Sequence, residues 1–169
     1  PKNLSFDFLL VFFIDIDPLA SKNRTACSNN LISLLDQSFP GVRGWFESPA
    51  RKDGSQRWVD FALTFLHMDC VRRVSLAAFT QRYSKWCKRN GYNSSAEKAA
   101  EIYSQAKDMI ALVPKSQTTK LLVQEAASQI TSLSRMVEVL RAEMNRLAAQ
   151  LPEYPVVMSM YGVGQSIGP

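Results

Sequence analysis

The longest regular pattern in the chain is a heptad repeat toward its C-terminal end. Apolar residues recur there at alternating spacings of three and four, the period of a coiled-coil seam. The a positions are Val123, Ile130, Val137, Met144 and Leu151, and the d positions are Ala126, Leu133, Leu140 and Leu147. The repeat predicts a coiled-coil helix over residues 118–151, ended by Pro152 and Pro155.

The heptad has more than one structural interpretation. β-branched residues at a with Leu at d favour a two-stranded parallel coil, so the leading hypothesis is a homodimer, with a higher oligomer left open. The residues assigned to dimerisation are Val123, Ile130, Leu133, Val137, Leu140, Met144, Leu147 and Leu151. Two alternatives remain: a long amphipathic helix packed on its own domain, and antiparallel pairing within one chain, using the helix near residues 96–110.

Three shorter helices are predicted before the heptad. The first covers residues 56–68 and has Trp58, Phe61, Ala62 and Phe65 on one face. The second covers residues 75–89, with Ser75 as its cap and an aromatic stripe at Phe79, Tyr83 and Trp86. The third runs to about Ile110 from a capping box of the form S-x-x-E at residues 94–97.

The N-terminal part shows a less regular pattern. Residues 4–16, "LSFDFLLVFFIDI", predict a buried strand closed by Pro18, although periodicity alone leaves a short helix open. Leu31, Leu34 and Leu35 lie at helical spacing and predict a helix over residues 19–39. The expected fold is therefore mainly α, with a short strand at residues 4–16.

These elements suggest four successive parts of the chain. Residues 1–18 form an atypical N-terminal segment, and residues 19–113 form a basic helical domain. The coiled-coil helix follows at 118–151, and residues 152–169 begin a further domain that is cut short.

Composition places this chain among globular proteins, since 46% of its residues are hydrophobic and 21% are charged. Its three cysteines contain no Cys-x-x-Cys pair, which favours free thiols in a reducing compartment. No signal peptide is visible, and the apolar run at residues 4–16 is shorter than the roughly 20 residues needed to span a bilayer. A cytoplasmic protein without membrane contact is expected.

Positive charge is concentrated in one part of the chain. Between Arg43 and Lys98 there are eleven Lys and Arg residues against five acids, whereas the whole chain has a net charge of +5. Such an excess favours a polyanionic partner, most often nucleic acid. The predicted nucleic-acid contacts are Arg72, Arg73, Arg82, Lys85, Lys88 and Arg89. The alternative is a solvated helix face without a partner.

Candidate catalytic chemistry is sparse. Asp15 and Asp17 end the predicted strand, where carboxylates often bind Mg²⁺ in nucleases, but a strand end that faces water is the simpler interpretation. His67 and Cys70 form one close pair, whereas zinc normally has two such pairs. With a single His and no Walker loop or Ser-His-Asp set, Asp15 is the only catalytic candidate, and no cofactor is assigned to the chain.

The end of the chain, "MYGVGQSIGP", has the form of the hairpin in a helix–hairpin–helix unit. Gly162 and Gly164 permit positive φ and allow backbone N–H groups to approach a phosphate. The alternative is an ordinary turn that ends a helix.

Four blocks of sequence together resemble a known family. They are "NNLISLLDQSFPGV", "WVDFALTFLH", "RYSKWCKRNGYN" and "LRAEMNRLAAQLPEYPVVMSMYGVGQSIGP". In this order they resemble the IS-one-ten family of bacterial insertion-sequence transposases, also called bridge-RNA-guided recombinases. The resemblance covers about residues 28–169.

The resemblance implies a fragment of a larger enzyme. In that family a resolvase-like domain with an Asp-Glu-Asp-Asp site that uses Mg²⁺ precedes the helical and coiled-coil region. A domain with a nucleophilic serine follows. Asp15 would be the first carboxylate, but Phe13 replaces the usual Gly, and Ser159 and Ser166 do not match the serine.

The resemblance also sets the expected function. This chain would provide dimerisation and contacts with DNA and a structured guide RNA, in the bacterial cytoplasm near the nucleoid, without catalysis of its own. Two alternatives remain open: a helical protein-interaction module, and a metal-dependent nuclease that uses Asp15 or Asp17.

Overall fold

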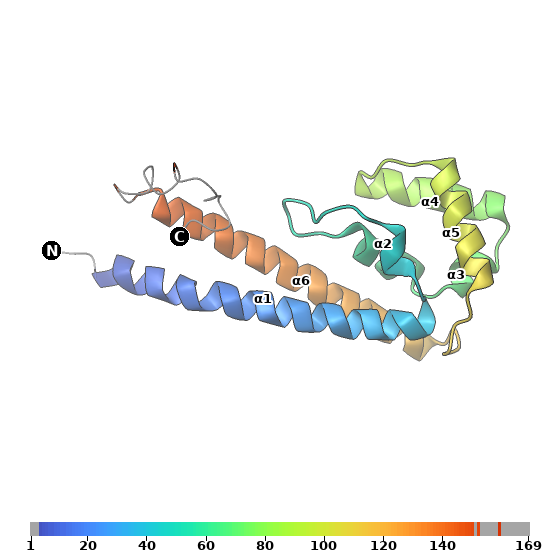
Figure 1. The fold of residues 1–169 in the computed structure, drawn as a ribbon, viewed down its shortest axis with the longest axis horizontal. Helices are drawn as coiled ribbons and strands as arrows, with labels where there is room; N and C mark the ends of the chain where they lie inside the picture. The colour runs from blue at the N-terminus through green and yellow to red at the C-terminus, as the bar shows by residue number, and fades with distance from the viewer. Residues whose placement is uncertain (1–3, 151, 153–158, 160–169) are drawn as a thin grey trace.

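The protein is mainly helical, as its periodicity predicts (Figure 1). A computed structural model describes residues 4–150, 152 and 159, with side chains from Pro18 onward. The helices are α1 (Leu4–Ser38), the 3₁₀ helix η1 (Val42–Trp45), α2 (Arg57–Phe65), α3 (Asp69–Arg72), α4 (Leu76–Asn90), α5 (Ala96–Asp108) and α6 (Gln117–Ala148). Among these residues there is no strand, and no helix is long and apolar enough to cross a membrane.

Two long helices form an arm, and the short helices form a head at one end of it (Figure 1). Helices α1 and α6 lie side by side and antiparallel along the arm. The head contains α2 to α5; α5 packs on α4 and α3, and α2 packs on α6. The head is inserted in sequence between the two arm helices, so the chain leaves the arm at Ser38 and returns to it at Gln117.

The strand predicted for residues 4–16 is wrong, because α1 is one helix of 35 residues from Leu4 to Ser38. Pro18 lies inside this helix instead of closing a strand. A short apolar run can form either a buried strand or part of a helix, and only the length of the whole element distinguishes the two. The helix predicted for residues 19–39 is present as the C-terminal part of α1.

The helix boundaries in the head follow local capping chemistry. Ser75 caps α4, its hydroxyl accepting a hydrogen bond from the Ala78 N–H at 3.3 Å, as predicted. Gly91 ends α4 with a φ of 65°, a conformation that favours glycine. Helix α5 starts one residue later than the capping box predicts, because Ser95 and not Ser94 is the cap.

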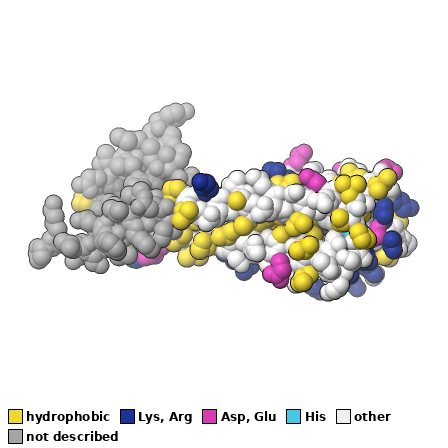
Figure 2. All heavy atoms as spheres, turned by 90° about the horizontal axis from the view of Figure 1, so that it is seen from below, with side chains coloured by type: hydrophobic (Ala, Val, Ile, Leu, Met, Phe, Trp, Pro, Cys, Tyr) yellow, Lys and Arg dark blue, Asp and Glu magenta, His cyan; other side chains and the backbone are white. Residues whose placement is uncertain are grey.

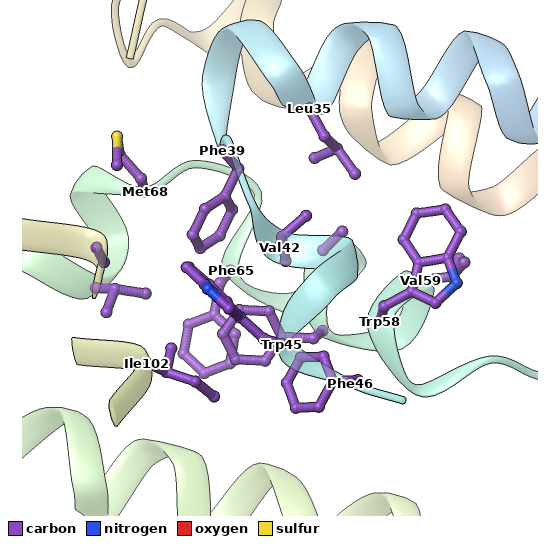
Figure 3. Packing of buried hydrophobic residues seen from close by; sticks show 14 of the residues in the cluster. Leu35, Phe39, Val42, Trp45, Phe46, Trp58, Val59, Phe65, Met68 and Ile102 are labelled. Atoms are coloured by element: carbon purple, nitrogen blue, oxygen red, sulfur yellow. The ribbon is translucent and has the colours of Figure 1, made fainter. Parts of the chain in front are cut away.

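An aromatic cluster forms the core of the head (Figure 3). Phe61 lies at its centre, with ring centroids 4.4 Å from Phe65, 5.1 Å from Phe46 and 5.4 Å from Trp86. The core continues into the arm through Leu31 and Leu35 of α1 and Val123, Ala127 and Ile130 of α6. Head and arm therefore share one hydrophobic core.

The buried side of α6 is wider than the predicted seam. Its buried residues include the a positions Val123, Ile130 and Val137 and the d position Leu147, together with Ala127 and Ser134 outside the heptad seam. The d positions Ala126, Leu133 and Leu140 are only half-buried. Burial extends past the seam because α6 contacts α2 as well as α1.

The seam residues of α6 are covered within a single chain. The pairing is antiparallel, the alternative left open by the sequence, but the partner helix is α1 and not the helix near residues 96–110. Residue Leu151 of the heptad and the turn glycines Gly162 and Gly164 lie outside the described residues.

Candidate nucleic-acid interface

Helix α4 carries the main cluster of predicted nucleic-acid contacts. Its inner face buries Phe79, Tyr83, Trp86 and Cys87 in the head core. The spacing of three and four residues then places Arg82, Lys85 and Arg89 on another face, where all three are exposed. None of them forms an ion pair or hydrogen bond with another residue that the structure describes.

These three cations line a surface hollow of about 450 Å³. The other lining residues are Thr64, Phe65, Cys70, Trp86 and Asn90, so α2, α3 and α4 all contribute to it. Phe65 and Trp86 are almost fully buried and provide an apolar base beneath the charged groups. The hollow thus combines a cationic rim with an aromatic floor.

Lys88 is exposed on the same helix but is not among the residues that line this hollow. With Arg89 it lies in the last turn of α4, where positive charge interacts favourably with the helix dipole. Lys and Arg side chains gather at the head end of the molecule in the face shown in Figure 2.

Arg72 and Arg73 lie in a different environment. Both form ion pairs with the buried carboxylate of Asp69, at 2.8 Å in the case of Arg73. Burial would raise the pKa of Asp69, but the hydrogen bond from Arg72 and the charges of both arginines outweigh it and lower this pKa. These two arginines line a second hollow of about 660 Å³, with His67 and Lys115. Of the six predicted cations, three therefore line the hollow beside α4, two lie around Asp69, and Lys88 lines neither hollow.

Two further arginines, which the sequence did not predict as site residues, hydrogen-bond to α4 and to the residues that follow it. The guanidinium of Arg57 donates to the Tyr83 hydroxyl at 2.8 Å and to the Asn93 carbonyl at 3.0 Å. Arg51 donates to the carbonyls of Asn90 and Gly91 at 2.7 and 3.0 Å, and lies 4.0 Å from the Tyr92 ring centroid. Burial raises the pKa of Tyr83 to about 12, so this phenol stays neutral.

The candidate metal and catalytic residues are not brought together. Asp15 and Asp17 belong to helix α1, so the strand end that suggested a metal site does not exist. His67 accepts a hydrogen bond from the Asp69 N–H at Nδ1 and contacts the Val113 carbonyl through Nε2, both at 3.1 Å. Both ring nitrogens therefore serve the fold. In the part of the chain with described side chains, no group of three potential metal ligands occurs.

The chain matches no protein-family profile, no curated protein and no solved structure.

Proposed function

We propose that this chain binds nucleic acid through α4, as the helical portion of a transposase of the IS-one-ten type that its sequence resembles. The observation that supports this most directly is the set of three exposed cations, Arg82, Lys85 and Arg89, without protein partners. Cations that only solubilise a helix are usually interspersed with acids. Helix α4 contains no Asp or Glu at all.

The spacing of the cations suits a phosphate backbone. Residues 82 and 89 are separated by about 10 Å along the helix axis, at 1.5 Å per residue. One nucleic-acid strand carries a charge about every 3.4 Å of duplex axis, so this stretch covers roughly three phosphates. Arg51 and Arg57 hydrogen-bond to Asn90 and Tyr83 of α4, which helps to position the helix that carries the three cations.

The test is a salt titration of binding to a labelled DNA duplex and a labelled RNA hairpin. Replacing Arg82, Lys85 and Arg89 together by Gln should weaken binding and reduce the slope of log K against log salt by about 2 to 3. A matched control replaces Lys22, Lys107 and Lys120 by Gln, which removes the same charge away from the hollow. If both triple variants lose affinity equally, binding is non-specific and the proposed interface is wrong.

We propose in addition that a second copy of the chain binds along the arm. The heptad seam of α6 is occupied by α1, but apolar side chains remain exposed outside it: Leu121, Leu122, Met136 and Val139, between 44% and 67% exposed. Exposed apolar side chains on a long helix can pair with the same side chains of a second copy.

A further inference from the structure

The hollow beside α4 has a feature that phosphate binding alone does not explain. Phosphates need cations, but Phe65 and Trp86 give this hollow an apolar base, and they are 6% and 5% exposed. Trp86 packs against two other rings, with its ring centroid 5.1 Å from that of Tyr92 and 5.5 Å from that of Tyr83. The occupant that fits best therefore has a flat apolar part joined to a negative charge.

An unpaired nucleotide has both of these parts. In a continuous duplex the bases stay stacked inside, so only sugars and phosphates could reach the hollow and its apolar base would gain no partner. An unstacked base can enter, while its flanking phosphates contact the cations on the rim. Combining cations with aromatic side chains is the usual way in which proteins bind single strands.

The size and polar groups of the hollow agree with this occupant. About 450 Å³ lies within the range of small-ligand sites, which runs from roughly 300 to 1,000 Å³. At its edge, the amide nitrogen of Asn90 donates to the Trp86 carbonyl at 2.8 Å. The amide oxygen of Asn90 accepts no hydrogen bond from the described residues, so it can accept one from a base.

We infer that this hollow binds one unpaired nucleotide, with the base against Phe65 and Trp86 and the phosphates at Arg82, Lys85 and Arg89. The inference rests on the proposed nucleic-acid binding at α4 and specifies its substrate as a bulged or single-stranded segment. A protein ligand with carboxylates is the competing occupant, and the test below separates the two.

The experiment compares three labelled probes at one salt concentration: a 12-base-pair DNA duplex, the same duplex with a single-nucleotide bulge, and a 12-nucleotide single strand. The bulged and single-stranded probes should bind roughly tenfold more tightly than the plain duplex. Thr64→Trp, at an exposed position that lines the hollow, should fill it and abolish this preference. Gln81→Trp, exposed on α4 outside the hollow, should preserve the preference.

A second measurement needs no substitution. Cys70 lines the hollow, whereas Cys27 lies on α1 in the arm, and both are half-buried free thiols. The bulged probe should slow alkylation of Cys70, measured by peptide mapping, and leave the rate at Cys27 unchanged. Equal protection of both thiols, or of neither, would contradict the inference.

The outcomes separate this inference from the function on which it rests. If all three probes bind equally and the Gln triple variant weakens all of them, nucleic-acid binding stands and the unpaired-nucleotide site is wrong. If no probe binds, both proposals fail. If an acidic 12-residue peptide binds more tightly than any probe and Thr64→Trp abolishes its binding, the occupant is a protein and the inference is overturned.

Discussion

At the scale of single residues, the arginines show that identical side chains have different roles in this molecule. Arg57 lies in an aromatic setting, its guanidinium carbon 5.1 Å from the Phe46 ring centroid and 5.0 Å from that of Tyr92. Arg72 is bound to Asp69 and to the Met109 carbonyl. Arg82 and Arg89 have no such partners among the described residues, which leaves them free to bind a ligand.

Gly54 is the residue at which a methyl group should matter most. It has a φ of 78°, and a Cβ placed there would lie 2.7 Å from the backbone of Ser134 in α6. Gly54→Ala should therefore lower the free energy of unfolding by about 2–4 kcal/mol, from the positive φ and from overpacking. Urea denaturation followed by circular dichroism measures this loss.

Gly44→Ala is the matched control for that substitution. Gly44 has no positive φ, and nothing lies within 4 Å of a Cβ at this position. Its replacement should change stability by less than about 0.5 kcal/mol. Equal effects of the two substitutions would show that the turn at residues 51–55 does not pack against α6.

At the scale of helices, the sequence predicted the elements of the head well and those of the arm only in part. Helices α4 and α6 have continuous apolar periodicity and clear caps, and both lie within a few residues of their predicted bounds. For α1, the part over residues 19–39 was predicted as a helix, but residues 4–16 were predicted as a strand, because a short apolar run suits either.

The sequence predicted which charged residues of the candidate site share a helix face, but it did not predict which residues of other helices contact them. Helical spacing correctly grouped Arg82, Lys85 and Arg89 on one face of α4. Phe65 and Cys70 complete the hollow because of the way in which α2 and α3 pack against α4. The local periodicity of the sequence carries no information on this packing. The ion pairs that bind Arg72 and Arg73 likewise depend on the burial of Asp69.

The arm should be an integral part of the fold and not an appendage. Ile130 of α6 is 1% exposed and belongs to the same core as the head. Ile130→Ala should destabilise the chain by about 2–5 kcal/mol, since it leaves a cavity where α6 meets the core. Gln129→Ala, on the same helix but at an exposed position, should cost less than about 0.5 kcal/mol.

Thermal unfolding of these two variants tests whether arm and head form one cooperative unit. A single transition should shift as a whole in the Ile130 variant, because the core is continuous between the two parts. Two separate transitions, with only one of them shifted, would contradict this.

At the scale of the whole molecule, two surfaces with different chemistry lie in different parts of the structure. The cationic hollow lies in the head, while exposed apolar residues lie on α6 in the arm. A second copy paired along the arm would therefore leave each hollow of the dimer accessible. Two ligand segments could then be bound by one assembly.

The dimer can be tested without disturbing the fold. Met136 and Val139 are neighbours on the exposed side of α6, so the double substitution Met136→Lys/Val139→Lys introduces like charges into the proposed contact. Sedimentation equilibrium should show a dimer for the unchanged chain at high micromolar concentration. The double variant should have a dimer dissociation constant more than tenfold higher, because burial of each such side chain contributes about 1.5–3 kcal/mol and a factor of ten requires about 1.4. Asn23→Lys/Asn30→Lys adds the same charge at exposed positions on α1 and should leave the dimer intact. A monomer at every concentration would refute the dimer and leave the proposed binding at α4 to its own test.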